Sequence, residues 1–155
     1  MLPLNSGILA QVLVSFFNGD PRNSNTIYLI QKHSGPSNSW TIHGLWPDHC
    51  DGTYDSTCDS SRQYTGIGTI LTGLGKSSLL SYMNTYWKDI SGDDESFWEH
   101  EWGKHGTCVS TLAPACYTGY TSKQEVGDYF QKAVDIFKTR DTYAVSQNPL
   151  RTKHD

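Results

Sequence analysis

The feature that most constrains this chain is a pair of segments rich in histidine and tryptophan, WTIHGLWPD at residues 40–48 and FWEHEWGKHGTC at residues 97–108. Together they contain three of the six histidines and four of the five tryptophans. Aromatic stretches usually form core, and isolated histidines are usually ordinary polar residues, so each segment alone has a plain structural interpretation. Their coincidence favours a site in which polar side chains lie beside large aromatic rings.

The first segment has the alternation of a strand. The apolar Trp40 and Ile42 alternate with Thr41 and His43, which predicts a strand with one buried face. Thr41 and His43 should then share the other face, and Gly44 should end the strand. His43 is therefore expected to point out of the core.

The second segment predicts a helix over residues 97–108. Four polar positions fall within about 140° of arc on such a helix, which puts them on one face: His100, Glu101, Lys104 and His105. Trp98 and Trp102 lie beside that face and could seal its edge. A solvated polar face is the usual interpretation of such a run. Two histidines, an acid and an amine among three aromatic residues favour a functional one.

Length and charge bound the class of protein. A chain of 155 residues is most simply one domain, spanning 1–155, and it is long enough to bury a core. Aromatic residues make up 12% and charged residues only 18%, which argues against disorder. The formal net charge of −4 excludes nucleic-acid binding through a general basic field, so any recognition of phosphate must be local.

The cysteines and the N-terminus bear on the compartment. None of Cys50, Cys58, Cys108 and Cys116 lies in a CxxC pair, which favours disulfides over a zinc cluster and implies an oxidising compartment. The apolar start of the chain lacks the basic residues of a signal peptide and carries Pro3, Asn5 and Gln11. It is also too interrupted for a membrane span. No membrane partner is expected.

The remaining pattern predicts two strands and two helices. Residues 8–17 and 26–31 should be strands, with a loop at 19–25 between them. One helix is marked by apolar spacing at Leu79, Leu80, Met83, Tyr86 and Trp87, with Ser77 and Ser78 as possible caps. The other is marked by Val126, Tyr129, Phe130, Ala133 and Phe137, preceded by a capping box over residues 122–125. Both helices should face the core and carry no chemistry.

Several familiar chemistries fail on spacing. A zinc protease needs His-Glu-x-x-His, and HEWGKH has one residue too many, so metal ligation stays open but loses its best template. GIGTILTGLGKSS does not align with a P-loop, and no nucleophile motif is present. Two histidines can instead serve as proton donor and acceptor, while a lysine binds a phosphoryl oxygen and a tryptophan stacks on a base. This combination fits RNA cleavage by the ribose 2′-hydroxyl, without metal or cofactor.

WTIHGLWPD and EHEWGKHGTC closely resemble the two active-site segments of the ribonuclease T2 family. The resemblance is strongest to fungal secreted members and runs almost continuously from Gly35 to about Tyr143. It implies an α+β fold, with helices packed on an antiparallel sheet. It also implies an extracellular, monomeric endoribonuclease that cuts single-stranded RNA through a 2′,3′-cyclic phosphate to a 3′-phosphate, with little base preference.

The resemblance assigns roles residue by residue. His43 matches the general acid for the leaving 5′-oxygen, and His105 the general base for the 2′-hydroxyl. His100 would bind the phosphate, while Glu101 and Lys104 would stabilise the transition state.

Four further positions match substrate-binding residues of the family. Trp46, Asp48 and Tyr54 match the primary base pocket, and Phe97 an aromatic of the second base site.

The resemblance also implies a disulfide and marks departures. Cys58 should bond Cys108, whereas the family partners of Cys50 and Cys116 are missing. Segments of about 12–34 and 144–155 look atypical, and the chain ends before strands that complete the sheet, which is expected to be truncated. Two alternatives therefore stay open: a catalytically weak RNA-binding remnant, and a histidine-based metal site.

Overall fold

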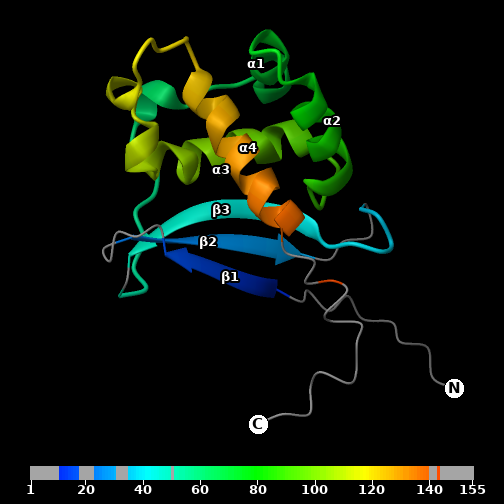
Figure 1. The fold of residues 1–155 in the computed structure, drawn as a ribbon. Coiled ribbons are helices and arrows are strands. Elements are labelled where there is room, and N and C mark those ends of the chain that lie inside the picture. Colours follow the sequence, from blue (N-terminus) through cyan, green and yellow to red (C-terminus); the bar gives the residue numbers. More distant parts are fainter. Residues whose placement is uncertain (1–10, 18–22, 31–34, 50, 140–142, 144–155) are drawn as a thin grey trace, which may run out of the picture.

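A computed structural model describes residues 11–17, 23–30, 35–49, 51–139 and 143. A three-stranded antiparallel sheet, in the order β1-β2-β3, carries helices on one side (Figure 1). The strands are β1 (Gln11–Phe17), β2 (Asn23–Ile30) and β3 (Thr41–His49). The expected α+β architecture, with helices packed on a short antiparallel sheet, is confirmed.

Strand β2 begins earlier than its sequence suggests. Residues 23–25 fall in the predicted loop at 19–25, yet they pair with His49, Asp48 and Pro47 of β3. Pairing with a neighbouring strand outweighs the local turn preference of this Asn-Ser-Asn stretch. The other part of that loop, at 19–22, and the predicted strand residues 8–10 and 31 lie outside the described residues.

Strand β3 does not end at Gly44, as predicted, but continues to His49. Tyr28 of β2 pairs with Gly44 and Leu29 with Ile42, so His43 is an extra residue in β3. An extra residue of this kind is a β-bulge, which bends a strand and re-aims a side chain. The prediction for Thr41 is also wrong, because it is buried along with Ile42 and both faces of the strand are covered there.

Within the described residues, four α-helices form the second layer: α1 (Ile67–Gly73), α2 (Ser77–Tyr86), α3 (Asp94–Lys104) and α4 (Gln124–Thr139). Short 3₁₀ turns follow or precede them, including η1 (Ser60–Arg62) and η2 (Gly106–Cys108). The aromatic core between the layers includes Ile42, Trp87, Trp102, Tyr129 and Phe130. Of the helices in the described part of the chain, none has the length and apolarity to span a membrane.

The predicted caps of α2 and α4 are wrong. Lys76 precedes α2 and makes no side-chain capping bond, so Ser77 and its neighbour lie inside the helix. The box at 122–125 is out of register, because α4 begins only at Gln124. Glu125 is buried instead and accepts hydrogen bonds from two tyrosine hydroxyls.

The segment after β3 is anchored to the end of α3. A disulfide joins Cys58 to Cys108, the pairing that the family resemblance implies. The Thr57 amide donates to the Lys104 carbonyl at 2.8 Å, and the indole of Trp102 donates to the Arg62 carbonyl at 2.6 Å. These contacts hold the stretch from Thr57 to Arg62 against the C-terminal end of α3.

Candidate active site

The site lies where β3 meets α3. The bulge of β3 supplies His43, and the same strand supplies Trp46 three residues later. The middle of α3 supplies Phe97 and Glu101, and His105 follows the last residue of that helix. Most of the proposed catalytic positions thus come together from two elements.

Glu101 is the centre of the cluster. Its side chain has no exposed surface, and its Oε2 accepts a 2.8 Å hydrogen bond from the indole nitrogen of Trp46. Its Oε1 lies 3.5 Å from Nε2 of His43. A buried carboxylate is costly unless it is paired in this way. Glu101 therefore connects the strand to the helix through two partners.

Gly44 makes this approach possible. A Cβ at this position would overlap the carboxylate of Glu101 and the indole nitrogen of Trp46. Sequence reasoning treated Gly44 only as a strand end and missed this role. A glycine inside a strand is a known signal of close approach by another group, so the signal was present.

His105 lies in the most secluded position. It is 2% exposed, and its ring stacks on Trp46 with centroids 4.3 Å apart and planes 9° apart. Within the described residues, neither of its ring nitrogens has a hydrogen-bond partner. Burial lowers the pKa of His105 to about 3, and the nearby charges of Lys104 and two histidines act in the same direction. The imidazole of His105 is therefore neutral at mildly acidic to neutral pH, which is the protonation state that a general base has before it takes a proton.

His43 is more accessible. Its side chain is 23% exposed and lies between two aromatic rings, with centroids 5.4 Å from Trp46 and 5.3 Å from Phe97. Its Nε2 faces the carboxylate of Glu101 at 3.5 Å, and the ring is open to a substrate with which it could exchange a proton.

His100 and Lys104 line the outer side of α3. His100 is exposed and its ring centroid is 6.4 Å from that of His105, while Lys104 is half-buried. On the polar face that the sequence predicts, Glu101 and His105 are buried. The site thus has a dry inner half and a wet, cationic outer half.

The predicted helix also ends earlier than expected. Helix α3 begins at Asp94, capped by Asp93, and ends at Lys104, so His105 precedes a 3₁₀ turn rather than lying inside the helix. Trp98 and Trp102 do not seal the edge of the site. They are core residues whose indoles donate to backbone carbonyls.

The predicted base-pocket residues extend from the cluster to the end of β3. Asp48 and Tyr54 face each other across an isolated antiparallel bridge, and Tyr54 is 60% exposed. His105 covers one face of the indole of Trp46. Any base that stacks on Trp46 must therefore use the other face.

A metal-ligand arrangement is also present. Among the described residues, His100, Glu101 and His105 each offer one ligand atom, and these atoms lie within 4.8 Å of one another. On a regular helix the two histidines of HEWGKH would point in widely different directions around the helix axis. They can still come together here because helix α3 ends at Lys104, before His105. Nitrogen and oxygen ligands of this kind suit zinc or a similar transition metal.

Comparison with known proteins gives one consistent result. The model of the Ribonuclease T2 family matches residues 13–149. This match takes in most of the 12–34 segment that looked atypical on motif resemblance.

The similar curated proteins are fungal ribonucleases. The chain is 62% identical over 110 residues to Ribonuclease Trv of Hypocrea rufa, which covers 71% of this chain and 47% of that protein. It is 61% identical over 110 residues to Ribonuclease T2 of Aspergillus oryzae, covering 71% of this chain and 40% of that protein. The chain thus spans about half the length, or less, of these relatives.

A solved structure agrees. The fold resembles the crystal structure of Actibind, described as a T2 ribonuclease, with a TM-score of 0.78 and 46% identity. The similarity covers 88% of this chain and 65% of that chain.

Proposed function

This chain belongs to the ribonuclease T2 family, and we propose that it carries the catalytic half of an endoribonuclease that cuts single-stranded RNA. The observation that supports this most is the convergence of His43, Glu101 and His105. The reaction transfers the phosphoryl group from the 5′-oxygen to the 2′-oxygen and leaves a 2′,3′-cyclic phosphate. Water then opens that ring to a 3′-phosphate.

In the first step His105 acts as the base. Its neutral imidazole takes the proton of the 2′-hydroxyl, and the 2′-oxygen attacks phosphorus. The bond to the 5′-oxygen breaks, and His43 gives that oxygen a proton. In the second step the roles reverse: His43 takes a proton from water and His105 returns one to the 2′-oxygen.

The transition state carries extra negative charge on the phosphoryl oxygens. Lys104 supplies a compact positive charge and His100 a hydrogen-bond donor at the outer side of α3. Glu101 orients His43 and Trp46 and balances the charge that His43 carries. The dry surroundings of Glu101 and His105 strengthen these interactions.

Substrate contacts are proposed for four further residues. Trp46 and Tyr54 offer ring faces on which a base can stack, and Asp48 beside Tyr54 can accept a base amino proton. Phe97 lies against His43, so a second base stacked there would lie next to the general acid. No cofactor is needed, and a secreted, monomeric enzyme is the form that family membership favours.

The direct test is incubation with a dinucleoside phosphate and detection of the 2′,3′-cyclic product. Wild-type protein should form it, and His105→Ala should not. His49→Ala is a matched control, because it removes a histidine that is exposed beside Asp55. Binding of the dinucleotide without any turnover by wild type would instead support the RNA-binding remnant.

The ligand arrangement of His100, Glu101 and His105 favours a metal site as the second candidate. The two candidates differ in their response to chelation. A histidine acid–base enzyme keeps its activity in excess EDTA, with a bell-shaped pH profile that peaks below pH 7. Loss of activity in EDTA, with recovery on addition of zinc, would favour the metal.

A further inference from the structure

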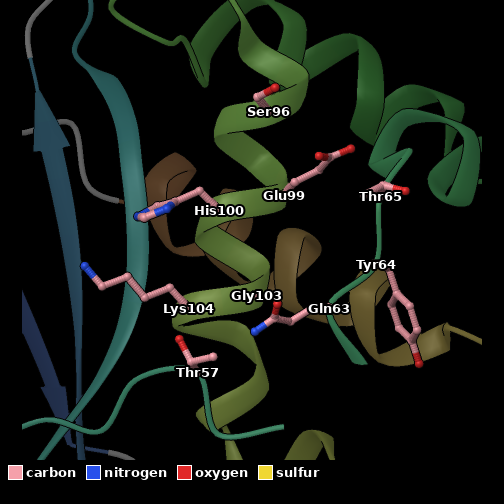
Figure 2. Close-up of a pocket in the computed structure, with 9 residues that line it drawn as sticks. All are labelled: Thr57, Gln63, Tyr64, Thr65, Ser96, Glu99, His100, Gly103 and Lys104. Atoms are coloured by element: carbon pink, nitrogen blue, oxygen red, sulfur yellow. The ribbon is translucent and has the colours of Figure 1, made fainter. Parts of the chain in front are cut away.

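A cavity of about 430 Å³ lies across the outer face of α3, and of its lining residues only His100 and Lys104 take part in the reaction described above. Figure 2 shows its lining residues: Thr57, Gln63, Tyr64, Thr65, Ser96, Glu99, His100, Gly103 and Lys104. A cavity of this size is at the lower end of the range that binds small ligands. A nucleoside is of this order of size.

The cavity is continuous with the proposed active site. His100 and Lys104 lie on one side of α3, and the segment from Gln63 to Thr65 lies on the other (Figure 2). The cavity therefore leads from the proposed phosphate-binding groups to a wall that the reaction does not need. A substrate held at His100 and Lys104 can extend into it.

The chemistry of the wall suits sugar and base edges rather than a stacked ring. Gln63 and Thr65 are exposed and can both donate and accept hydrogen bonds. Tyr64 cannot serve as a free platform, because its ring lies parallel to Trp102 at 6.3 Å and the ammonium group of Lys123 lies 4.8 Å from its centroid. Recognition at this wall must come from hydrogen bonds.

The charges give the cavity a direction. Glu99 lies at the wall end, where its Oε1 accepts a 2.8 Å hydrogen bond from the amide of Gly66. A carboxylate repels phosphate but accepts bonds from ribose hydroxyls and base amino groups. The ammonium group of Lys104 and the imidazole of His100 lie at the other end. A nucleotide would therefore enter with its phosphate towards α3's catalytic side and its base towards Gln63.

The cavity is also preformed. Gly103 has no side chain, which leaves space opposite Gln63, and the nearest atom to a Cβ built there is Cγ of Gln63 at 3.6 Å. Another edge of the cavity, at Thr57, is held by the bond from the amide of Thr57 to the carbonyl of Lys104 and by the nearby Cys58–Cys108 disulfide. Little ordering is needed on binding, which favours affinity.

We propose that this cavity is a subsite for a third nucleotide of the RNA, one beyond the two that flank the cleaved bond. The proposal rests on the proposed ribonuclease function. The third nucleotide extends from the end of the cavity at His100 and Lys104, which hold the reacting phosphate, and contacts Gln63, Thr65 and Glu99 through its sugar and base edge.

The test compares dinucleotides with trinucleotides extended at either end. Affinities of uncleavable 2′-deoxy analogues are measured by direct binding, and kcat/KM is measured for the matching ribonucleotides. Wild type should prefer one of the two trinucleotides in both measurements. Gln63→Ala should lower that preference by about two- to tenfold, the loss of one or two hydrogen bonds.

Gly103→Ala probes the same space by filling it. The added methyl group meets Gln63 at ordinary contact distance, and alanine is favoured over glycine inside a helix, so folding should not suffer. The preference for a trinucleotide should fall again. One matched control is Gln131→Ala, which removes an exposed side-chain hydrogen bond to Asp135 on α4. The other is Gly73→Ala in α1, where nothing lies within 4 Å of the new methyl group. Both control variants should keep the wild-type preference for the trinucleotide.

The two proposals fail differently. Equal affinity of wild type for dinucleotide and both trinucleotides overturns the subsite, whether or not the protein cleaves RNA. An unchanged preference in both Gln63→Ala and Gly103→Ala overturns its location. Absence of cleavage with a Gln63-dependent preference in binding supports the subsite and overturns the enzymatic function.

Discussion

The indole nitrogen of Trp46 donates a 2.8 Å hydrogen bond to the carboxylate of Glu101, 55 residues further along the chain. This bond joins strand to helix at a point with no access to water, because Glu101 is fully buried. The same carboxylate approaches His43, and the other face of the cluster is closed by His105 stacked on Trp46. A change at any of these residues should therefore affect the others.

Gly44→Ala should damage the site although Gly44 itself has no proposed catalytic role. Its methyl group would overlap the partners of the bond between Trp46 and Glu101. Overpacking of this kind typically costs about 1–3 kcal/mol of stability. The expected result is a lower midpoint of urea unfolding and a loss in kcat. Gly73→Ala is the control, since its methyl group meets nothing within 4 Å. Wild-type activity in Gly44→Ala would contradict this account.

Substitution of the two proposed proton carriers should affect turnover. His43→Ala and His105→Ala should each lower kcat by about 10²–10⁴. These losses should appear in single-turnover measurements at saturating substrate, because chemistry rather than binding is impaired. Turnover near that of wild type in both His43→Ala and His105→Ala would show that the roles are assigned wrongly.

Trp46 should affect both binding and turnover. Loss of base stacking costs about 1–3 kcal/mol, which raises KM by roughly one to two decades. Trp46→Ala also removes the donor to Glu101 and the ring against His105, so kcat should fall as well. Trp46→Phe separates these effects, because it keeps a stacking ring and loses only the donor. Its KM should stay near that of wild type while its kcat falls.

The motifs predicted the existence of β3 and α3 and the residues that meet between them. They did not predict the bulge at His43, because a bulge depends on the register with β2. The burial of Glu101 was also missed, since helical spacing shows which residues share a side but not what covers it. Similarly, Asn23 to Asn25 look like a turn until their partners on β3 are known. The local sequence pattern is enough to predict the strands and helices. The geometry of the site depends on how these elements pair and pack, which the local pattern does not show.

The pH dependence of stability should report on His105. Its pKa falls from 6.5 when exposed to about 3 when folded, so the unfolded chain binds a proton that the folded protein excludes. This contribution to stability is complete above pH 6.5 and is lost as the pH falls towards 3. Its size is on the order of a few kcal/mol.

Hydrogen bonds from Thr53 and Ser61 lower the pKa of the carboxyls of Asp51 and Asp59, respectively. Both carboxyls therefore protonate only below pH 3.8, the ordinary pKa of an aspartate. Between pH 4 and 6.5 the loss should therefore be dominated by His105. Urea unfolding of His105→Gln across this range should give a flatter profile than wild type. His49→Gln, at an exposed position, should keep the wild-type slope. Equal slopes in wild type and His105→Gln would refute the assignment.

The disulfide between Cys58 and Cys108 should hold the end of the catalytic helix. The two residues are separated by 50 positions. In the chain-entropy model, a disulfide that closes a loop of that size raises the free energy of unfolding by roughly 4 kcal/mol. The double variant Cys58→Ala/Cys108→Ala should lose a large part of this stability. It should also lose activity at temperatures where wild type is folded, because the Thr57 anchor at Lys104 loosens with it.

Thiol chemistry provides the control for this variant. Cys116 is exposed and carries a free thiol, whereas Cys50 lies outside the described residues. Labelling of non-reduced protein, followed by peptide mapping, should modify Cys116 and leave Cys58 and Cys108 protected. Cys116→Ala should then unfold at the same urea concentration as wild type, because the substitution breaks no bond that holds the site. A monomer with a Cys50–Cys116 bond and a marked loss of stability in Cys116→Ala would show that a second crosslink supports this half of the family fold.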